Sequence, residues 1–291
     1  MPIHSTLRRY PALSYSQTIP FILFHLATLI SVFWCPPTLP LIALCLATYT
    51  IRMFGVTAGY HRYFAHRSFK TGRVFQLILA FLAQSSAQQG VLWWAAHHRH
   101  HHKFSDHPED LHSPLQSGFW WSHLGWIFAR DHLPTRFELI RDFEKYAELR
   151  FLNRYPLIPI ILMGIALFII GGTPWLVWGL GVSTVFLWHG TFTINSLSHV
   201  FGTRRFRTSD TSRNNPVLAL ITLGEGWHNN HHRYPSSTRQ GFYWWEFDIT
   251  YWVLRGFCLI GLVSDLRSPP RQIYEEAALS RLPLILSNQS R

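Results

Sequence analysis

Apolar residues gather into four long segments, and most polar residues lie between or after them. A membrane-spanning helix needs about 20 consecutive apolar residues. We expect four spans, at residues 17–35, 38–58, 155–172 and 175–198. The linkers CPPTLP and GGTP inside the two pairs carry no charge. Each pair is therefore predicted to form a hairpin with a tight turn.

The positions of Lys and Arg predict how these spans are oriented. Most of them lie between the two hairpins and in the tail. Because positive loops stay in the cytoplasm, we expect both termini and the polar segments to lie there. Arg52, near the cytoplasmic end of its span, is expected to snorkel. The fold prediction is an all-α, multi-pass integral membrane protein with one domain over 1–291. Four transmembrane helices would stand under a cytoplasmic helical cap formed by 59–154 and 199–270.

Two further apolar stretches are ambiguous. Residues 74–94 are interrupted by Gln and Ser, which favours a helix on the membrane interface; an additional span is the alternative. Residues 251–263 are too short to span and are expected to form a packed cap or interfacial helix. Residues 267–291 carry no chemistry that we can identify.

Composition narrows the class of protein. Charged residues make up 14% of the chain and apolar residues 48%, whereas about a quarter of an average soluble domain is charged. The net charge of +11 forms no basic stripe, and no nucleic-acid motif is present, so we expect no nucleic-acid partner. The three cysteines lie in apolar stretches without paired spacing, which excludes a cysteine-rich metal site.

Three histidine clusters carry the chemistry: HRYFAH at 61–66, HHRHHH at 97–102 and HNNHH at 228–232. The last two contain H-x-x-H-H, in which positions i, i+3 and i+4 share one helical face. Imidazole suits iron, zinc, copper and nickel. Two such triplets exceed the four ligands of a tetrahedral zinc site. The simplest interpretation is two metal ions in an all-histidine cage.

Spacing also predicts how ligands divide. His61 and His66 are five apart and cannot share a face of a straight α-helix, so either the helix ends between them or they serve different metals. Within the second cluster, positions i and i+4 can reach one ion while i+3 reaches its neighbour. Asn195 and His199, at i and i+4, are expected to share one face at the end of the fourth span.

The remaining histidines are expected to be less direct participants. Surface, capping or hydrogen-bonding roles are predicted for His4, His107, His112, His123 and His132. We expect His100 to meet solvent, His97 to support the ligands, and His25 and His189 to pack or line a pocket. Four carboxylates could orient ligand imidazoles or instead bond backbone and Arg groups: Asp106, Glu109, Asp110 and Glu225.

HRYFAH, HHRHHH followed by KFSD, NSLSH and EGWHNNHH together resemble the membrane fatty acyl desaturases of the Δ9 acyl-CoA type, particularly their bacterial branch. The resemblance covers roughly residues 40 to 265. It implies an O2-dependent enzyme of the bacterial inner membrane that uses two iron ions to place a cis double bond in a saturated acyl chain. A hydroxylase or acetylenase of the same superfamily is the alternative. From a different class, a histidine-rich metal transport or storage protein would need ligands along an intramembrane pathway.

The resemblance also implies the ligands. The family's nine histidines fall on His61, His66, His98, His101, His102, His199, His228, His231 and His232. One iron would be held by His61, His98, His102 and His228, with Asn195 contacting it through water; the other five histidines would hold the second iron.

The residues that contact the substrate headgroup in the family are only partly present in this sequence. The Arg-Asp pair that precedes the second box in animal acyl-CoA enzymes is Ala96 and His97 here. Of the expected headgroup contacts, Arg130 is retained and Gln89 replaces an Asn, so acyl-CoA is favoured while acyl carrier protein and intact lipid stay open. Trp188 is expected in the substrate pocket, and Tyr49, roughly 18 Å before His61 along a helix, is predicted to be its floor. The sequence carries no cytochrome b5 heme motif, so electrons should come from a separate ferredoxin or cytochrome b5-like donor.

Overall fold

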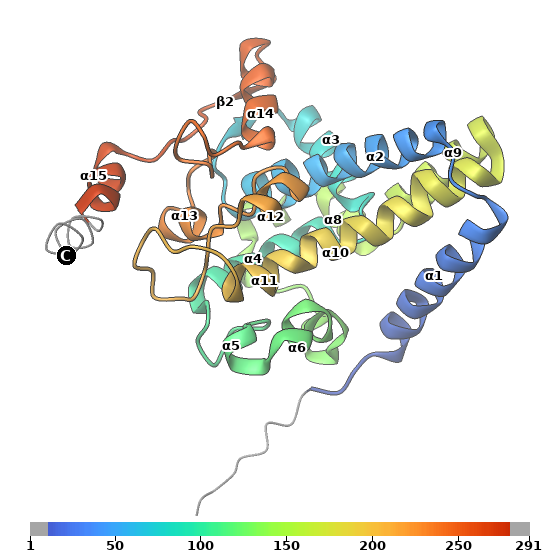
Figure 1. The fold of residues 1–291 in the computed structure, drawn as a ribbon, viewed down its shortest axis with the longest axis horizontal. Helices are drawn as coiled ribbons and strands as arrows, with labels where there is room; N and C mark the ends of the chain where they lie inside the picture. Colours follow the sequence, from blue (N-terminus) through green and yellow to red (C-terminus); the bar gives the residue numbers. More distant parts are fainter. Residues whose placement is uncertain (1–10, 280–291) are drawn as a thin grey trace, which may run out of the picture.

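The computed structural model describes residues 11–279, and within them the chain is mostly helical (Figure 1). The first half contains α1 (Tyr15–Trp34), α2 (Leu39–Phe54), the π-helix η1 (Gly55–Ala65), α3 (Arg73–Gln84), α4 (Val91–Phe104), α5 (Pro114–Ser117), α6 (Phe119–His123), the 3-10 turns η2 (Gly125–Phe128), η3 (Arg130–His132) and η4 (Phe137–Leu139), α7 (Arg141–Glu144) and α8 (Ala147–Arg154). The second half contains α9 (Ile158–Trp175), the π-helix η5 (Leu176–Val182), α10 (Ser183–Asn195), α11 (Leu197–Val200), α12 (Pro216–Ile221), α13 (His228–Arg233), α14 (Ile249–Leu259) and α15 (Arg271–Leu279). The strands β1 (Lys70–Thr71) and β2 (Val263–Ser264) pair antiparallel, a small departure from the predicted all-α fold.

Three segments of the described chain are long and apolar enough to cross a bilayer: Tyr15–Trp34, Leu39–Ala65 and Ile158–Val200. The third, with 43 residues, is about 65 Å of helix, twice the thickness of a bilayer core. It is broken at Gly172, whose φ of 65° is left-handed and suits a residue without a side chain. Beyond the break the chain folds back, and Leu167 of α9 lies 3.2 Å from the position of a Cβ on Gly179 of η5. The predicted second hairpin is therefore present.

The apolar helices pack around η5 and α10. α2 lies against both, whereas α1 packs mainly on η5 and diverges from α2 after the turn near Cys35 (Figure 1). Gly181 allows the close approach of α1, because a Cβ there would sit 3.2 Å from the hydroxyl of Thr28. The first hairpin is thus closed at its turn but splayed toward the cap.

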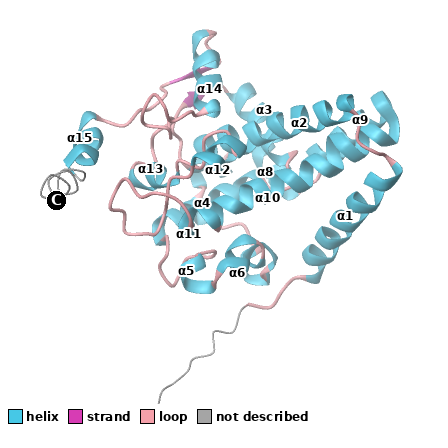
Figure 2. Cartoon of the chain, in the orientation of Figure 1, coloured by secondary structure: helices cyan, strands magenta, loops and turns pink. Residues whose placement is uncertain are grey.

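The polar segments form a cap at the end of this bundle opposite the two turns. Long irregular stretches join α11 to α12 and α13 to α14, and they surround the short helix α13 (Figure 2). One continuous buried apolar core runs from the bundle into the cap, through residues such as Met53, Phe64, Leu92, Leu149 and Leu254.

Two expectations are refined by this arrangement. The stretch 74–94 is split between α3 and α4 by a turn at 85–90, and α3, with 12 residues, is too short to span, which argues against an additional span. Arg52 does not snorkel: it is 1% exposed. Its guanidinium donates to the hydroxyls of Ser183 at 2.5 Å and Thr184 at 2.7 Å.

Candidate di-metal centre and acyl cavity

The π-helix η1 places the first two candidate ligands. The backbone N–H of His66 donates to the carbonyl of His61 at 3.1 Å, an i→i+5 bond of the π type. Residues five apart then lie nearly one above the other, and the two imidazole rings are 4.8 Å apart. The spacing excludes a shared face only on a straight α-helix, whereas η1 is a π-helix that ends at Ala65, between the two histidines, as one of the two predicted alternatives has it.

The helix α13 places the last three candidate ligands, His228, His231 and His232. It has six residues, and its position is fixed by the two asparagines of HNNHH rather than by its length. Asn229 accepts bonds from the backbone N–H groups of Arg205 and Phe206, both at 2.8 Å. Asn230 donates to the carbonyl of Gln240 at 3.0 Å. The loops on either side therefore hold the helix in place.

The structure brings all nine predicted histidines together in two groups, with the candidate ligand atoms of each group within 4.8 Å of one another. The first group comprises His61, His66, His98, His102 and His231, and the second comprises His101, His199, His228 and His232.

In the first group the Nε2 atoms converge. Those of His61 and His231 are 3.0 Å apart, and those of His231 and His102 are 2.9 Å apart. His98 continues the series with Nε2 contacts of 3.0 Å to His102 and 2.9 Å to His66. Five nitrogens from three separate segments thus face a common point.

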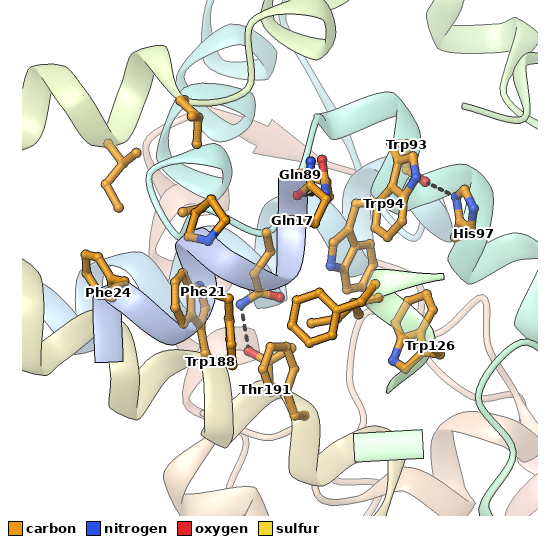
Figure 3. A pocket seen from close by; sticks show the side chains of 18 of the residues that line it. Gln17, Phe21, Phe24, Gln89, Trp93, Trp94, His97, Trp126, Trp188 and Thr191 are labelled. Atoms are coloured by element: carbon orange, nitrogen blue, oxygen red, sulfur yellow. Dashed lines mark hydrogen bonds between the residues drawn. The ribbon is translucent and has the colours of Figure 1, made fainter. Parts of the chain in front are cut away.

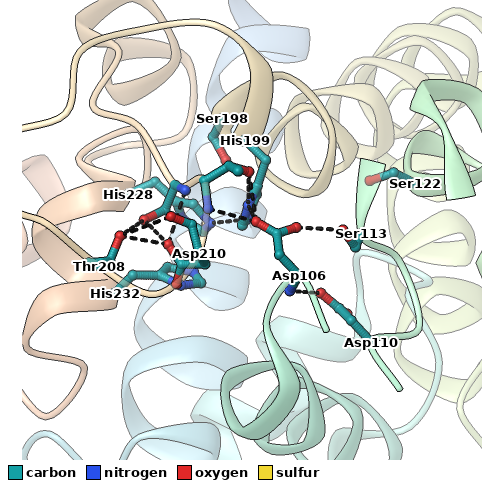
Figure 4. Close-up of polar contacts among 12 residues, drawn as sticks. Asp106, Asp110, Ser113, Ser122, Ser198, His199, Thr208, Asp210, His228 and His232 are labelled. Atoms are coloured by element: carbon teal, nitrogen blue, oxygen red, sulfur yellow. Dashed lines mark hydrogen bonds and ion pairs between the residues drawn. The ribbon is translucent and has the colours of Figure 1, made fainter. Parts of the chain in front are cut away.

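In the second group, carboxylates hold the outward-facing Nδ1 atoms (Figure 4). His101 donates to Asp110 at 3.0 Å, His199 to Asp106 at 3.2 Å and His232 to Asp210 at 2.6 Å. Since a neutral imidazole has one N–H, each Nε2 is left as a lone pair pointing inward. Nε2 of His199 lies 3.1 Å from Nε2 of His228, so the inner nitrogens of this group also face one another.

This donor set fits two transition-metal ions. Lone pairs that face each other at about 3 Å repel unless a cation lies between them. Nε2 of His232 is buried and has no hydrogen-bond partner, as expected of a nitrogen reserved for a metal. Carboxylates on the far side of ligand imidazoles are the usual support in metal sites, because they fix the tautomer. His61 has the same support from Glu225.

For most of the nine histidines the electrostatics favour a neutral imidazole, whereas Asp110, against the opposing effect of burial, raises the pKa of His101. Burial, followed by repulsion from neighbouring histidines, lowers the pKa of His66, His98, His102, His228 and His231 well below the ordinary value. Neutral histidines are the form that binds metal.

The supporting carboxylates are held in their charged form. Burial alone would raise the pKa of Asp106 and Asp210, but the bonds from His199 and His232 lower it well below the usual range. Of the four carboxylates considered from sequence, Asp106, Asp110 and Glu225 support a histidine, whereas Glu109 is exposed and contributes only its backbone carbonyl, to His100. Asp210 was missed, because it lies in an irregular loop where no spacing signals its role.

The grouping differs from the division that the resemblance implies at three positions. His66 and His231 belong to the first group, and His228 belongs to the second. The π-helix accounts for His66. On α13, His228 and His232 are one turn apart with rings separated by 4.3 Å, while His231 turns toward His61, 4.4 Å away. The prediction that His98 and His102 separate from His101 is confirmed.

A cavity of about 520 Å³ adjoins the first group (Figure 3). Its wall includes His98, and Trp94 stacks on that imidazole with ring centres 5.0 Å apart. Aromatic side chains of α1, α4, η2 and α10 line it, together with Gly164, Leu176 and Leu180 of α9 and η5. Among the described residues that line it, none is Lys, Arg, Asp or Glu. The cavity is therefore shaped for an apolar chain.

The predicted substrate residues fall in different places. Gln89, Trp188 and Asn195 line the cavity. Gln89 donates to Gln17 of α1 at 3.1 Å, and Trp188 donates to the carbonyl of Ser86 at 2.8 Å. Asn195 belongs to neither histidine group, and the helix breaks after it at Ser196, so it does not share one continuous face with His199.

Arg130 and Tyr49 lie outside the cavity wall. Arg130 is exposed and donates to the carbonyl of Leu13 at 3.2 Å. The hydroxyl of Tyr49 donates to the carbonyl of Ile221 at 2.8 Å. The expected floor residue Tyr49 is therefore not among the residues that line the cavity, whereas Gly164, Leu176 and Leu180 of α9 and η5 are.

Three histidines outside the two groups form a thread through the structure. His25 of α1 contacts His189 of α10 at 3.3 Å, and His189 contacts His123 of α6 at 3.0 Å. His123 also contacts the hydroxyl of Ser196 at 2.9 Å. His112 and His132 are buried, not at the surface, and His100 is half-buried, whereas His107 is exposed and His4 lies outside the described residues. His97 lines the cavity without joining either group.

Comparison with known proteins agrees with this geometry. Residues 37–263 match the family model described as fatty acid desaturase. The chain belongs to the fatty acid desaturase family. The match includes all nine histidines of the two groups and most of the cavity wall.

Three relatives illustrate the range of the family. The Delta-9 acyl-lipid desaturase 2 of Arabidopsis thaliana is 39% identical over 236 residues, which cover 80% of this chain and 76% of the relative. The acyl-CoA 5-desaturase AL21 of Anemone leveillei is 38% identical over 242 residues, covering 82% and 73%. The sn-1 stearoyl-lipid 9-desaturase of Synechocystis sp. is 37% identical over 220 residues, covering 74% and 68%. This chain is thus an oxidoreductase of lipid metabolism with a fatty acyl substrate.

Proposed function

We propose that this protein is an O2-dependent membrane desaturase that places a cis double bond, at Δ9, in a saturated acyl chain by means of two iron ions. The observation that carries the proposal is the cavity: a space without Lys, Arg, Asp or Glu in its described lining, whose wall includes His98 of the first histidine group. Each turnover removes two hydrogens from adjacent methylenes and takes up two electrons and two protons, and one O2 becomes two waters.

In this proposal, iron bound by the nine histidines supplies the oxidising power that no side chain provides. The chain's own residues do the placing. Trp94 and Trp188 hold the acyl chain against the metal end of the cavity, and the bond of 3.0 Å from Gln88 to Thr191 fixes two walls relative to each other. Methylenes offer no polar handle, so the shape of this wall selects the bond that is oxidised.

Expression in a host lacking Δ9 unsaturation, with double bonds mapped by mass spectrometry, tests the reaction. We expect His98→Ala, His102→Ala and His231→Ala to abolish the product and lower bound iron, and His107→Ala, an exposed histidine, to serve as the matched control. A hydroxylated or acetylenic product would replace the proposal with the alternative chemistry. Wild-type activity in any of the three variants would contradict the metal assignment.

We further propose that the four apolar arms α1, α2–η1, α9 and η5–α10 each cross the membrane, with both termini and the histidine groups in the cytoplasm. The support is the break at Gly172 together with the uncharged turns near Cys35 and Gly171. Bacterial inner membrane is the proposed location. Reporter fusions at each terminus measure the orientation, and an extracytoplasmic signal at either end would overturn it.

Acyl-CoA is the carrier that the motifs favour, and acyl carrier protein is another soluble source of the acyl chain. One observation favours membrane lipid as the second candidate. Leu157 and Ile161 line the cavity and are also 56% and 54% exposed on α9 and its N-cap, so the cavity wall reaches the surface that faces lipid. No charged residue among the described lining would bind CoA phosphates. Stearoyl-CoA, stearoyl-acyl carrier protein and stearoyl phospholipid in nanodiscs, supplied separately to purified protein, distinguish the three.

A further inference from the structure

The loop from Thr203 to Arg213 covers the second histidine group with a positive surface. It carries four arginines, of which Arg205 is paired with Glu246 and Arg213 is half-buried, and its single acid, Asp210, is buried. Arg204 and Arg207 are exposed. The loop lies beside α13, at the end of the molecule opposite the tips of α2 and α9 (Figure 1). Its charge is therefore presented on the cap, away from the apolar turns.

The inner side of the same loop touches the metal-site residues. Asp210 holds Nδ1 of His232 at 2.6 Å. Thr211 donates to Asp106 through both its backbone N–H, at 2.7 Å, and its hydroxyl, at 2.6 Å, and Asp106 holds His199. Exposed Arg207 lies only three positions before the carboxylate that binds a ligand imidazole. The positive surface is thus the outer side of the loop whose inner side supports the imidazoles of the second group.

The loop is a built structure rather than a flexible arm. Arg204 donates to the carbonyls of Thr208 at 2.9 Å and Asp210 at 2.7 Å. Phe206 is buried against Phe242, with ring centres 5.9 Å apart. A surface fixed in this way presents its charges in one arrangement, which suits the docking of a protein partner.

We propose that the loop Thr203–Arg213 is the docking surface for an acidic one-electron carrier protein that reduces the metal centre. This inference rests on the proposed function, which requires two electrons per turnover from outside the chain. Charge complementarity selects an acidic partner. None of the loop's residues lines the acyl cavity, which separates this surface from the binding of a substrate headgroup.

The test measures desaturation with two acidic donors in separate arms, a reduced ferredoxin and a soluble cytochrome b5 heme domain, at low and high salt. In Arg207→Glu we expect the KM for the donor that serves the enzyme to rise roughly tenfold at low salt. At high salt the KM values of Arg207→Glu and the unchanged protein should approach each other, because salt screens exposed charges. The maximal rate with saturating donor should stay near that of the unchanged protein. Arg255→Glu, an exposed arginine on α14, is the matched control and should leave the KM unchanged.

A second measurement keeps loss of fold apart from loss of docking. Bound iron and single-turnover desaturation after chemical reduction by dithionite should equal those of the unchanged protein in Arg207→Glu. An unchanged donor KM in Arg207→Glu, or an equal rise in Arg255→Glu, would overturn the docking surface while leaving the proposed reaction intact. If the unchanged protein makes no alkene after chemical reduction, the proposed function itself fails.

Discussion

Asp210 and Asp106 support neighbouring ligands in different ways, and replacement by Asn should weaken iron binding at Asp210 but hardly change it at Asp106. In Asp210, Oδ2 accepts from His232, while Oδ1 accepts from the N–H of Ser212 at 3.0 Å and the hydroxyl of Thr208 at 2.8 Å. An amide has one accepting atom. If its oxygen keeps the Ser212 N–H, its NH2 group faces Nδ1 of His232 and forces the other tautomer.

That tautomer carries its proton on Nε2, which then cannot bind metal. The reverse amide orientation leaves two donors, the NH2 group and the Ser212 N–H, facing each other. Both orientations of the amide in Asp210→Asn therefore conflict with the site. Loss of a support of this kind costs about 10- to 100-fold in metal affinity, or about 1.4 to 2.7 kcal/mol.

Asp106→Asn is the matched control, because an amide fits there. Oδ2 accepts from His199 and from both groups of Thr211, while Oδ1 accepts only from the hydroxyl of Ser113, at 2.5 Å. An amide oxygen at the first position keeps His199 in place, and the NH2 group donates to Ser113. The backbone φ of 61° is also one that Asn tolerates.

Iron affinity is measured by competition with a chelator on metal-free protein, and tautomer by nitrogen NMR of the labelled imidazoles. We expect Asp210→Asn to bind the second iron 10- to 100-fold more weakly and Asp106→Asn to change it less than about threefold. Both substitutions remove one negative charge, so equal losses would show that charge, not tautomer, decides, and would refute the reasoning.

Buried groups and the cavity give three further predictions. Burial lowers the pKa of His98, His102 and His228 in the folded protein, whereas a histidine in the unfolded chain has a pKa of about 6.5. The stability that these neutral histidines contribute is therefore fully present above that pH and is lost as the pH falls below it. The melting temperature of the metal-free protein should therefore fall from pH 7 to pH 5; a flat or rising curve contradicts this. Gly164→Leu should narrow the cavity beside Leu180, since a Cβ added at Gly164 would lie 3.1 Å from Cδ1 of Leu180, and should shift products toward shorter acyl chains by roughly tenfold. Tyr49→Ala, outside the cavity lining, should leave the profile unchanged, and an unaltered chain-length profile in Gly164→Leu would argue against this part of the cavity as the limit on chain length. His189→Phe should lower the melting temperature, because it breaks the hydrogen bonds of His189 to His25 and His123. His189→Gln should lower it less, and equal melting temperatures in the two variants would show that these bonds do not stabilise the fold.

The long apolar segments and the shared face of each H-x-x-H-H triplet could be predicted from sequence, because long apolar runs and i, i+3, i+4 spacing report local geometry. The full set of nine histidines rests on the resemblance of the motifs to a known family, and the structure brings all nine together. What could not be predicted depended on departures from regular helix. The spacing of His61 and His66 is misleading unless η1 is known to be a π-helix. The roles of Asp210 and Tyr49 depend on how distant segments pack, and no local pattern in the sequence records that packing.

Arg52 has a consequence for how the membrane bundle assembles. A guanidinium within a translocated helix is costly, by about 2.5 to 3.5 kcal/mol where it lies at the helix centre and less toward the ends. In the folded protein its two side-chain partners are Ser183 and Thr184 of α10, which are made 131 and 132 residues later, and the carbonyls of Thr48 and Ser85 accept as well. Until α10 is made, the guanidinium has only the carbonyls of Thr48 and Ser85 among the partners that it contacts in the folded protein. Biogenesis is expected to hold α2 at the insertion machinery until α10 emerges, which makes the two halves of the protein obligate partners during synthesis.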